Sequence, residues 1–204
     1  MKYKVIIFDF DGVLCCDYFY ASLSKSCPDV HKFIETKVFG GGSDIPDRWM
    51  RNQMTSDSVN KYISSHTEID FERLSDLLKQ DVRNMRIDDR LIRLANRFKE
   101  NGRLIALVTD NMDVFNSITI EKHNLNKTFP VIINSCDYGI LKCEENGRLF
   151  DIAMDKLRHD DYKNALLIDD SEKTREIFKK KGGNTFAYTT YEEFKPWAKE
   201  NLIG

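Results

Sequence analysis

Hydrophobic residues along the chain fall into short apolar runs that alternate with segments of helical spacing. Five runs rich in Val, Ile, Leu and Phe predict buried strands, at residues 4–8, 103–108, 131–134, 165–168 and 185–188. Apolar residues at helical spacing predict helices between and after them, at residues 89–100, 151–158, 172–181 and 192–201. Strands that alternate with helices are typical of βαβ units in a parallel sheet. We therefore predict an α/β protein with helices on both faces of a parallel sheet.

One long segment, residues 16–85, interrupts this alternation. It has no convincing strand pattern, and residues 58–64 and 71–82 carry apolar side chains at helical spacing. The glycines at 40–42 indicate a flexible turn within the segment. We predict a core made of residues 1–15 and 86–204, with an all-helical domain of residues 16–85 inserted after the first strand.

Composition and charge restrict the classes of partner. The chain has 204 residues, with 31 Lys and Arg against 33 Asp and Glu, so it has no bulk attraction for nucleic acid or an anionic membrane. The apolar run at the start is too short for a signal peptide or a membrane span. The 5 cysteines and 4 histidines show neither a disulfide framework nor zinc-site spacing. We expect a cytoplasmic monomer or homodimer that binds neither nucleic acid nor membrane.

Acidic and polar residues follow three of the predicted strands. In an open parallel sheet, ligands bind beyond the carboxyl ends of the strands. Carboxylates that converge there repel one another unless a cation offsets their charge, and Mg²⁺ suits a few carboxylates, water and a substrate phosphate. The residues are Asp9 and Asp11 after the first strand, Thr109, Asp110 and Asn111 after the second, and Asp169 and Asp170 after the fourth.

The residue types at this edge suit phosphoryl transfer. Asp9 and Asp11 are two residues apart, so their side chains point to the same side of an extended backbone. One carboxylate can attack a phosphorus atom while the other handles protons. Thr109 offers a hydroxyl, and the helix after it offers free backbone N–H groups to a phosphate. Lys142, after the third strand, can neutralise carboxylate or phosphate charge.

The segment Asp9-Phe10-Asp11-Gly12-Val13 resembles motif one of the haloacid dehalogenase-like (HAD) hydrolase superfamily. Thr109 resembles its motif two, Lys142 its motif three and Asp169-Asp170 its motif four, and the order and spacing of the four agree over the whole chain. One departure is Cys143, which follows Lys142 where the family commonly has proline. The resemblance implies a Rossmann-like core with strand order 5-4-1-2-3 and a helical cap of the C1 type at the insert.

The resemblance also implies a role for each motif residue. Asp11 would be the general acid/base, with its backbone carbonyl on the metal; phosphatases of the superfamily have this second aspartate and the dehalogenases lack it. Asp110 and Asn111 are further candidates for contact with the substrate. The other implied roles are nucleophile and Mg²⁺ ligand for Asp9, phosphoryl contacts for Thr109 and Lys142, and Mg²⁺ ligands for Asp169 and Asp170.

These observations together predict a Mg²⁺-dependent phosphatase that hydrolyses a small phosphorylated metabolite through an aspartyl-phosphate on Asp9. A phosphomutase shares every core motif and differs in its cap chemistry, and Asp11 makes a haloacid dehalogenase the weaker alternative. A phospho-receiver module belongs to a different class, but its phosphorylated aspartate ends the third strand, where this chain has Asn134-Ser135. A non-catalytic binding relative is the last alternative.

Overall fold

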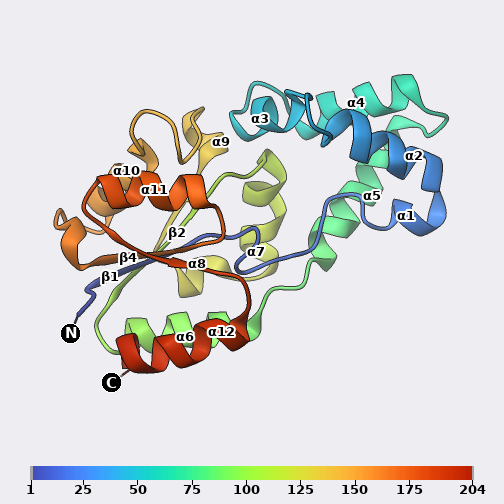
Figure 1. The fold of residues 1–204 in the computed structure, drawn as a ribbon. Helices are drawn as coiled ribbons and strands as arrows, with labels where there is room; N and C mark the ends of the chain where they lie inside the picture. The colour runs from blue at the N-terminus through green and yellow to red at the C-terminus, as the bar shows by residue number, and fades with distance from the viewer. Residues whose placement is uncertain (1, 204) are drawn as a thin grey trace.

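The strands form one parallel sheet. The computed structural model describes residues 2–203, and its five strands lie in the order β3-β2-β1-β4-β5, which confirms the predicted order (Figure 1). Each predicted strand matches an observed strand to within one residue at either end. The strands are β1 (Val5–Phe8), β2 (Leu104–Thr109), β3 (Val131–Asn134), β4 (Ala165–Asp169) and β5 (Asn184–Ala187).

Helices cover both faces of the sheet because successive strand residues point to opposite faces. Val5 and Ile7 of β1 pack in one buried cluster with residues of α10 (Arg148–Lys156) and α11 (Glu172–Lys180). Ile6 and Phe8 pack in the other with residues of α6 (Asp89–Glu100) and α12 (Tyr191–Ala198). Figure 1 shows these two helix pairs above and below the sheet.

The other elements of this part of the chain are short. The helix predicted at residues 151–158 begins earlier, at Arg148, because Gly147 before it takes a left-handed conformation with φ of 76°. Within residues 2–203, none of the helices combines the length and the apolar composition that crossing a bilayer requires. The short elements are η2 (Phe115–Thr119), α7 (Ile120–Lys122), α8 (Leu125–Thr128), α9 (Ser135–Tyr138), η3 (Tyr162–Asn164) and η4 (Lys199–Ile203).

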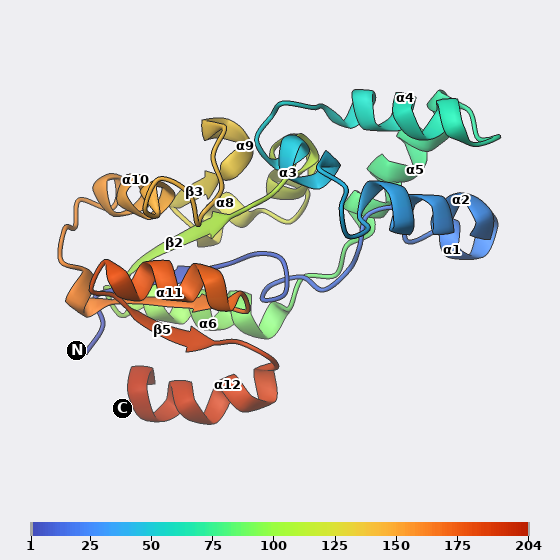
Figure 2. The ribbon, with the colours of Figure 1, turned by 45° about the horizontal axis from the view of Figure 1, so that its top comes forward.

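Residues 16–85 form helices and no strand. Thr55 and Ser58 form a reciprocal capping box at the start of one helix, and Asp70 caps the next. Figures 1 and 2 show this segment beyond one edge of the sheet, on the side away from the chain termini. Its elements are α1 (Leu23–Ser26), α2 (Pro28–Phe33), η1 (Ile34–Val38), α3 (Ile45–Met50), α4 (Ser56–His66) and α5 (Phe71–Asn84).

The two chain segments that enter and leave residues 16–85 are paired with each other. The Asp88 N–H donates to the Leu14 carbonyl at 2.9 Å. The Arg86 guanidinium donates to both carboxylate oxygens of Asp17, at 2.7 and 3.1 Å. Both connections therefore pass side by side between the sheet domain and residues 16–85.

A second set of contacts joins helix α3 to the loops after β2 and β3. The buried Trp49 indole donates to Asp113 Oδ1 at 2.7 Å. The Arg51 guanidinium pairs with Glu144 at 2.5 Å, and the Ser135 hydroxyl donates to the backbone carbonyl of Met50 at 2.8 Å. The helical insert therefore contacts the sheet domain through the paired connections and through α3, and α5 packs against η2 as well.

Candidate active site

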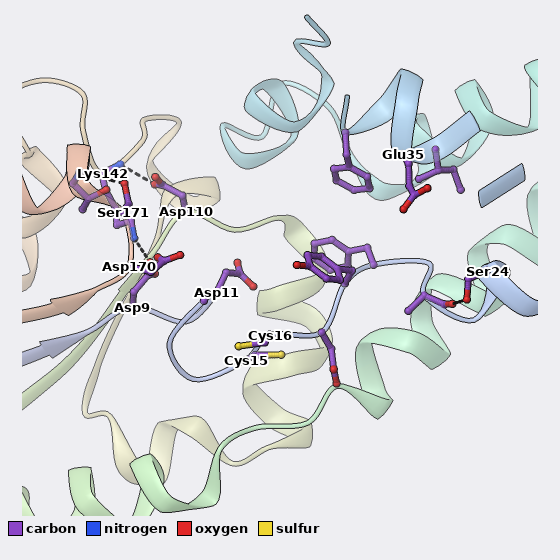
Figure 3. A pocket seen from close by; sticks show the side chains of 18 of the residues that line it. Asp9, Asp11, Cys15, Cys16, Ser24, Glu35, Asp110, Lys142, Asp170 and Ser171 are labelled. Atoms are coloured by element: carbon purple, nitrogen blue, oxygen red, sulfur yellow. Dashed lines mark hydrogen bonds and ion pairs between the residues drawn. The ribbon is translucent and has the colours of Figure 1, made fainter. Parts of the chain in front are cut away.

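A buried lysine lies between two buried carboxylates at the carboxyl edge of the sheet. Asp9 follows β1 and Lys142 lies in the loop after α9 (Figure 3), and Asp169 ends β4. Lys142 Nζ is 2.5 Å from Asp9 Oδ2 and 2.9 Å from Asp169 Oδ2. None of the three side chains belongs to a residue more than 5 % exposed. The structure thus brings the first, third and fourth sequence motifs into direct contact.

The loop that carries Lys142 is held by two carboxylates. Asp110 Oδ1 accepts a hydrogen bond from the backbone N–H of Lys142 at 2.8 Å. Glu144 Oε2 accepts one from the N–H of Leu141 at 2.8 Å. The loop therefore places Lys142 against Asp9, although the next residue is Cys143 and not the proline that HAD-like hydrolases commonly have there. Asp110 supports this placement and also lines the cavity described below.

Asp11 is oriented by a buried amide. Asn111 Nδ2 donates to Asp11 Oδ2 at 2.8 Å, and the Asn111 backbone N–H donates to Asn134 Oδ1 and Ser135 Oγ, both at 3.1 Å. Asn111, one of the candidate substrate contacts, therefore lies against Asp11. The sequence interpretation assigned no role to Asn134 or Ser135. The sequence does place these two polar residues at the carboxyl end of the third strand, which is the feature that could have identified them.

Burial dominates the electrostatics of these carboxylates. It raises the pKa of Asp9 well above its usual value, and the charges of Asp169 and Asp11 add to the increase while Lys142 opposes it. Burial also raises the pKa of Asp11 to about 7, supported by Asp170 and opposed by Lys142. Burial alone would lower the pKa of Lys142, but the nearby carboxylates outweigh it and raise the pKa. The lysine is therefore charged, and the site holds an excess of buried acids.

Three carboxylates fit a divalent cation. Asp9, Asp169 and Asp170 each offer an oxygen atom, and these atoms lie within 4.8 Å of one another. A donor set of carboxylate oxygens is the type that Mg²⁺ prefers. Gly12 has φ of 73°, and a Cβ atom there would collide with the Asp170 carboxylate, so glycine lets Asp170 approach the loop after β1. The Asp11 side chain lies outside this set.

Thr109 differs from the other motif residues. It is fully buried at the end of β2, and its hydroxyl has no hydrogen-bond partner within residues 2–203. A buried polar atom without a partner is destabilising, by roughly 1–3 kcal/mol, until a donor or acceptor reaches it. The predicted contact between Thr109 and a phosphate thus stays a prediction.

A cavity of about 970 Å³ runs from this edge of the sheet to the helical insert. Figure 3 shows the acidic residues at one end and Glu35 of the insert at the other. Thr109, Asn111 and Asp169 lie outside the residues that line it, whereas the other predicted site residues line it directly. These lining residues are Asp9, Asp11, Asp110, Lys142 and Asp170.

Comparisons with known proteins establish the fold. No family model matches the chain, and neither does any curated protein at a significant level. A predicted HAD-like family hydrolase from Porphyromonas gingivalis superposes with a TM-score of 0.78 at 14 % identity, covering 100 % of both chains. A HAD family enzyme from Bacteroides thetaiotaomicron gives 0.74 at 16 % identity, covering 96 % of this chain and 98 % of that one.

Two further solved structures have a similar fold. The B. thetaiotaomicron enzyme has also been solved in complex with magnesium and inorganic phosphate, with a TM-score of 0.67 at 14 % identity over 94 % of this chain and 98 % of that one. A dehalogenase gives 0.63 at 14 % identity, with coverage of 90 % and 83 %. At such identities the likeness shows the fold alone. The chain has the Rossmann-like fold of HAD-like hydrolases, as its motifs predicted.

Proposed function

We propose that this chain, which has the fold of HAD-like hydrolases, belongs to that superfamily and is a Mg²⁺-dependent phosphatase acting on a small phosphorylated metabolite. The observation that carries the proposal is the 2.5 Å contact between Lys142 Nζ and Asp9 Oδ2, at the base of a cavity that Asp11 also lines. A carboxylate held by a lysine beside a second acid suits a nucleophile with an acid/base partner.

In the proposed reaction, an Asp9 oxygen attacks the phosphorus atom, and the bond from phosphorus to the leaving oxygen breaks. The Phe10 N–H, which donates to Asp9 Oδ1 at 2.7 Å, and Lys142 hold the attacking carboxylate. Asp11 gives a proton to the leaving oxygen and then takes one from the water that cleaves the aspartyl-phosphate. The products are an alcohol and inorganic phosphate, and the Asp9 carboxylate is restored.

We propose that Asp9, Asp169 and Asp170 hold the Mg²⁺, together with the backbone carbonyl of Asp11. When bound, the ion supplies positive charge that attracts a phosphate and offsets the charge of the transferred group. The all-oxygen donor set supports this assignment, as does the magnesium and phosphate complex of the B. thetaiotaomicron enzyme. Lys142 and Asp110, from the cavity wall, and the Thr109 hydroxyl would contact the phosphoryl group.

We propose that residues 16–85 are a C1-type cap over a core of residues 1–15 and 86–204. The paired segments around Leu14 and Asp88 give the cap a hinge, and its helices line the far end of the cavity. Lids of this kind exclude water and select substrate by closing. All five cysteines are free, which supports a cytoplasmic location.

Hydrolysis of para-nitrophenyl phosphate tests the proposal. We expect turnover with MgCl₂ and none in excess EDTA. Asp9→Asn removes the attacking oxygen, so this variant should show no turnover. Intact-protein mass spectrometry after acid quench should find no phospho-enzyme. Asp160→Asn is the matched control, since this exposed aspartate lies before β4, at the opposite edge of the sheet. Full activity in EDTA would contradict the metal assignment, and a phosphorylated Asp9→Asn protein would contradict the nucleophile.

A further inference from the structure

The cap end of the cavity is aromatic. Tyr18 is 81 % exposed and Phe39 is 38 % exposed, and these are the exposed large hydrophobic side chains of the described chain. Both line the cavity, together with Phe19 and Ile34. The Phe19 and Phe39 rings are stacked, with centroids 6.4 Å apart and an interplanar angle of 15°. Exposed aromatic rings in a cavity wall leave apolar area for a ligand to cover.

The charged side chains of the lining are acidic with one exception. Lys142 is the single lysine or arginine among the described lining residues, and it is already bound to Asp9 and Asp169. At the cap end, Glu35 is 64 % exposed, with His31 Nδ1 3.5 Å from its carboxylate. Figure 3 shows Glu35 across the cavity from Asp9. A second anionic group on a substrate would therefore meet mainly carboxylates, because the remaining basic side chain of the described lining, His31, already contacts Glu35.

The size of the cavity also restricts the substrate. About 970 Å³ lies at the upper end of the range of small-molecule sites, far more than a phosphate group occupies. The space beyond the phosphate can hold a ring-sized group against Phe19 and Phe39. A substrate of two or three carbon atoms would leave Tyr18 and Phe39 exposed to water, and a bisphosphate, as in a phosphomutase cycle, would place its second phosphate among carboxylates.

We propose that the substrate is a phosphate monoester whose alcohol part carries a planar apolar group and no negative charge, with a protonated amine preferred at the end near Glu35. This inference rests on the proposed phosphatase function and adds the chemical class of the leaving alcohol. The aromatic wall binds the planar group, and Glu35 attracts the cation. Glu35 is a specificity-determining residue rather than a catalytic one, because it is at the far end of the cavity from Asp9.

Three benzyl phosphates with the same reacting group test the proposal. They carry an aminomethyl, a methyl or a carboxylate group at the para position, and ethyl phosphate is the small reference. We expect kcat/KM to fall in that order, with the aminomethyl ester about 3-fold above the methyl ester, as for an exposed charge pair. The carboxylate ester should lie about 10-fold below the methyl ester because like charges face each other.

Variants test separately the charge of Glu35 and the apolar contact of Phe39. Glu35→Gln should reduce the ratio of the aminomethyl to the methyl ester to about 1, since the charge that creates the 3-fold preference is gone. Glu72→Gln is the matched control, an exposed cap glutamate outside the cavity lining, and it should leave the ratio unchanged. Phe39→Ala should lower kcat/KM for the methyl ester about 10-fold relative to ethyl phosphate, because apolar contact is lost.

The outcomes distinguish this inference from the proposed function. If ethyl phosphate and the benzyl esters are all inert with Mg²⁺, the phosphatase function fails and this inference fails with it. If the esters are hydrolysed but the carboxylate ester is the best of the three, the substrate class is wrong and the phosphatase stands. An amine preference that survives in Glu35→Gln would likewise overturn the role of Glu35.

Discussion

The two ends of the cavity differ in how their side chains are held. At the sheet end, Asp9, Lys142 and Asp169 are buried and bound to one another, and Asn111 fixes Asp11. At the cap end, Tyr18 and Glu35 are largely exposed to solvent and Phe39 is partly exposed. The sheet end keeps charges out of water at a cost in stability, while the cap end leaves apolar surface uncovered.

Because of this difference, we assign the chemistry to the sheet end of the cavity and the choice among substrates to the cap end. Groups that act on a reacting atom must be positioned before the substrate arrives, and burial among fixed partners achieves that. Groups that distinguish one alcohol from another gain from surface that a ligand covers on binding. Substitutions at the sheet end should therefore affect every substrate, and those at the cap end should change the ranking among substrates.

The largest expected effect separates Asp11 from Asp9 at the sheet end. Asp11→Asn leaves the nucleophile in place but removes the proton donor and acceptor, so kcat should fall by about 10²–10⁴-fold on an alkyl phosphate. The loss should shrink for para-nitrophenyl phosphate, whose leaving group needs less protonation. Phospho-enzyme should accumulate on that substrate, because the second step still lacks its base, and rapid-quench mass spectrometry can detect it. An equal loss for both leaving groups would show that Asp11 does not protonate the leaving oxygen.

The next effect concerns the contact that joins the two regions at α3. Asp113→Ala leaves the fully buried Trp49 indole N–H without its acceptor and also removes the acceptor of the Ser56 N–H and hydroxyl, which should lower the free energy of unfolding by about 1–3 kcal/mol. Urea denaturation measures this change. A looser cap should also raise KM for the benzyl esters more than it lowers kcat on para-nitrophenyl phosphate. Asp137→Ala, which removes an exposed acid bound to Asn116, is the control.

A second substitution makes the α3 test sharper. In the Asp113→Ala background, Trp49→Phe removes the unpaired N–H and keeps an aromatic ring. Replacing both partners of a hydrogen bond costs much less than removing one. The double variant should therefore be less destabilised than the sum of the two single variants. Strict additivity would show that the Trp49–Asp113 bond contributes nothing to holding the cap.

Much of the sheet end could be predicted from the sequence, because its signals are local. Apolar runs of four to six residues mark the strands, and the acids that follow them must meet at one edge of a parallel sheet. The contact between Lys142 and Asp9 was implied by the resemblance of the motifs to those of HAD-like hydrolases. The bond from Asn111 to Asp11 was not predicted, since it depends on how two loops from different strands pack.

The cap end could be predicted far less well, because its contacts join distant parts of the chain. Trp49 and Asp113 are 64 residues apart in sequence, and nothing in either segment marks the pairing. The sequence predicts a flexible turn at the glycines of positions 40–42, and none of these glycines lines the cavity. At Gly40 a Cβ atom would collide with the backbone carbonyl of Thr36, so this glycine permits a close approach of two backbone segments.

Gly40 gives a smaller test at the cap end. Gly40→Ala forces η1 and the turn after it apart and should lower the free energy of unfolding by about 1–2 kcal/mol. Gly41→Ala is the matched control, since a Cβ there meets no atom within 4 Å, and it should change stability by less than about 0.5 kcal/mol. Because Phe39 precedes this turn, Gly40→Ala should also reduce kcat/KM for the benzyl esters relative to ethyl phosphate. Equal stability of the two variants would show that the turn adapts without cost.

The smallest expected effect lies where the two regions meet, at the ion pair of Glu144 and Arg51. The Arg51 hydrogen bond holds the pKa of Glu144 below its ordinary value, helped by the Leu141 N–H and by Lys173, while Asp47 also contacts Arg51. A carboxyl group whose pKa is lower in the folded state adds stability above its unfolded pKa, about 4.3, and loses it as the pH falls through the folded value.

Glu144→Gln should therefore cost about 0.5 kcal/mol at pH 7, a value suited to a partly exposed pair. The difference in free energy of unfolding between the native protein and this variant should close as the pH falls below about 4. The native protein then loses the same contribution because Glu144 is protonated. Urea denaturation of both proteins at pH 7 and pH 3.5 measures the gap, with Glu121→Gln as an exposed control. A gap that widened in acid would mean that the neutral Glu144 side chain, rather than its charge, holds Arg51. The join between core and cap would then be a hydrogen bond independent of charge, and the cap would stay closed at low pH.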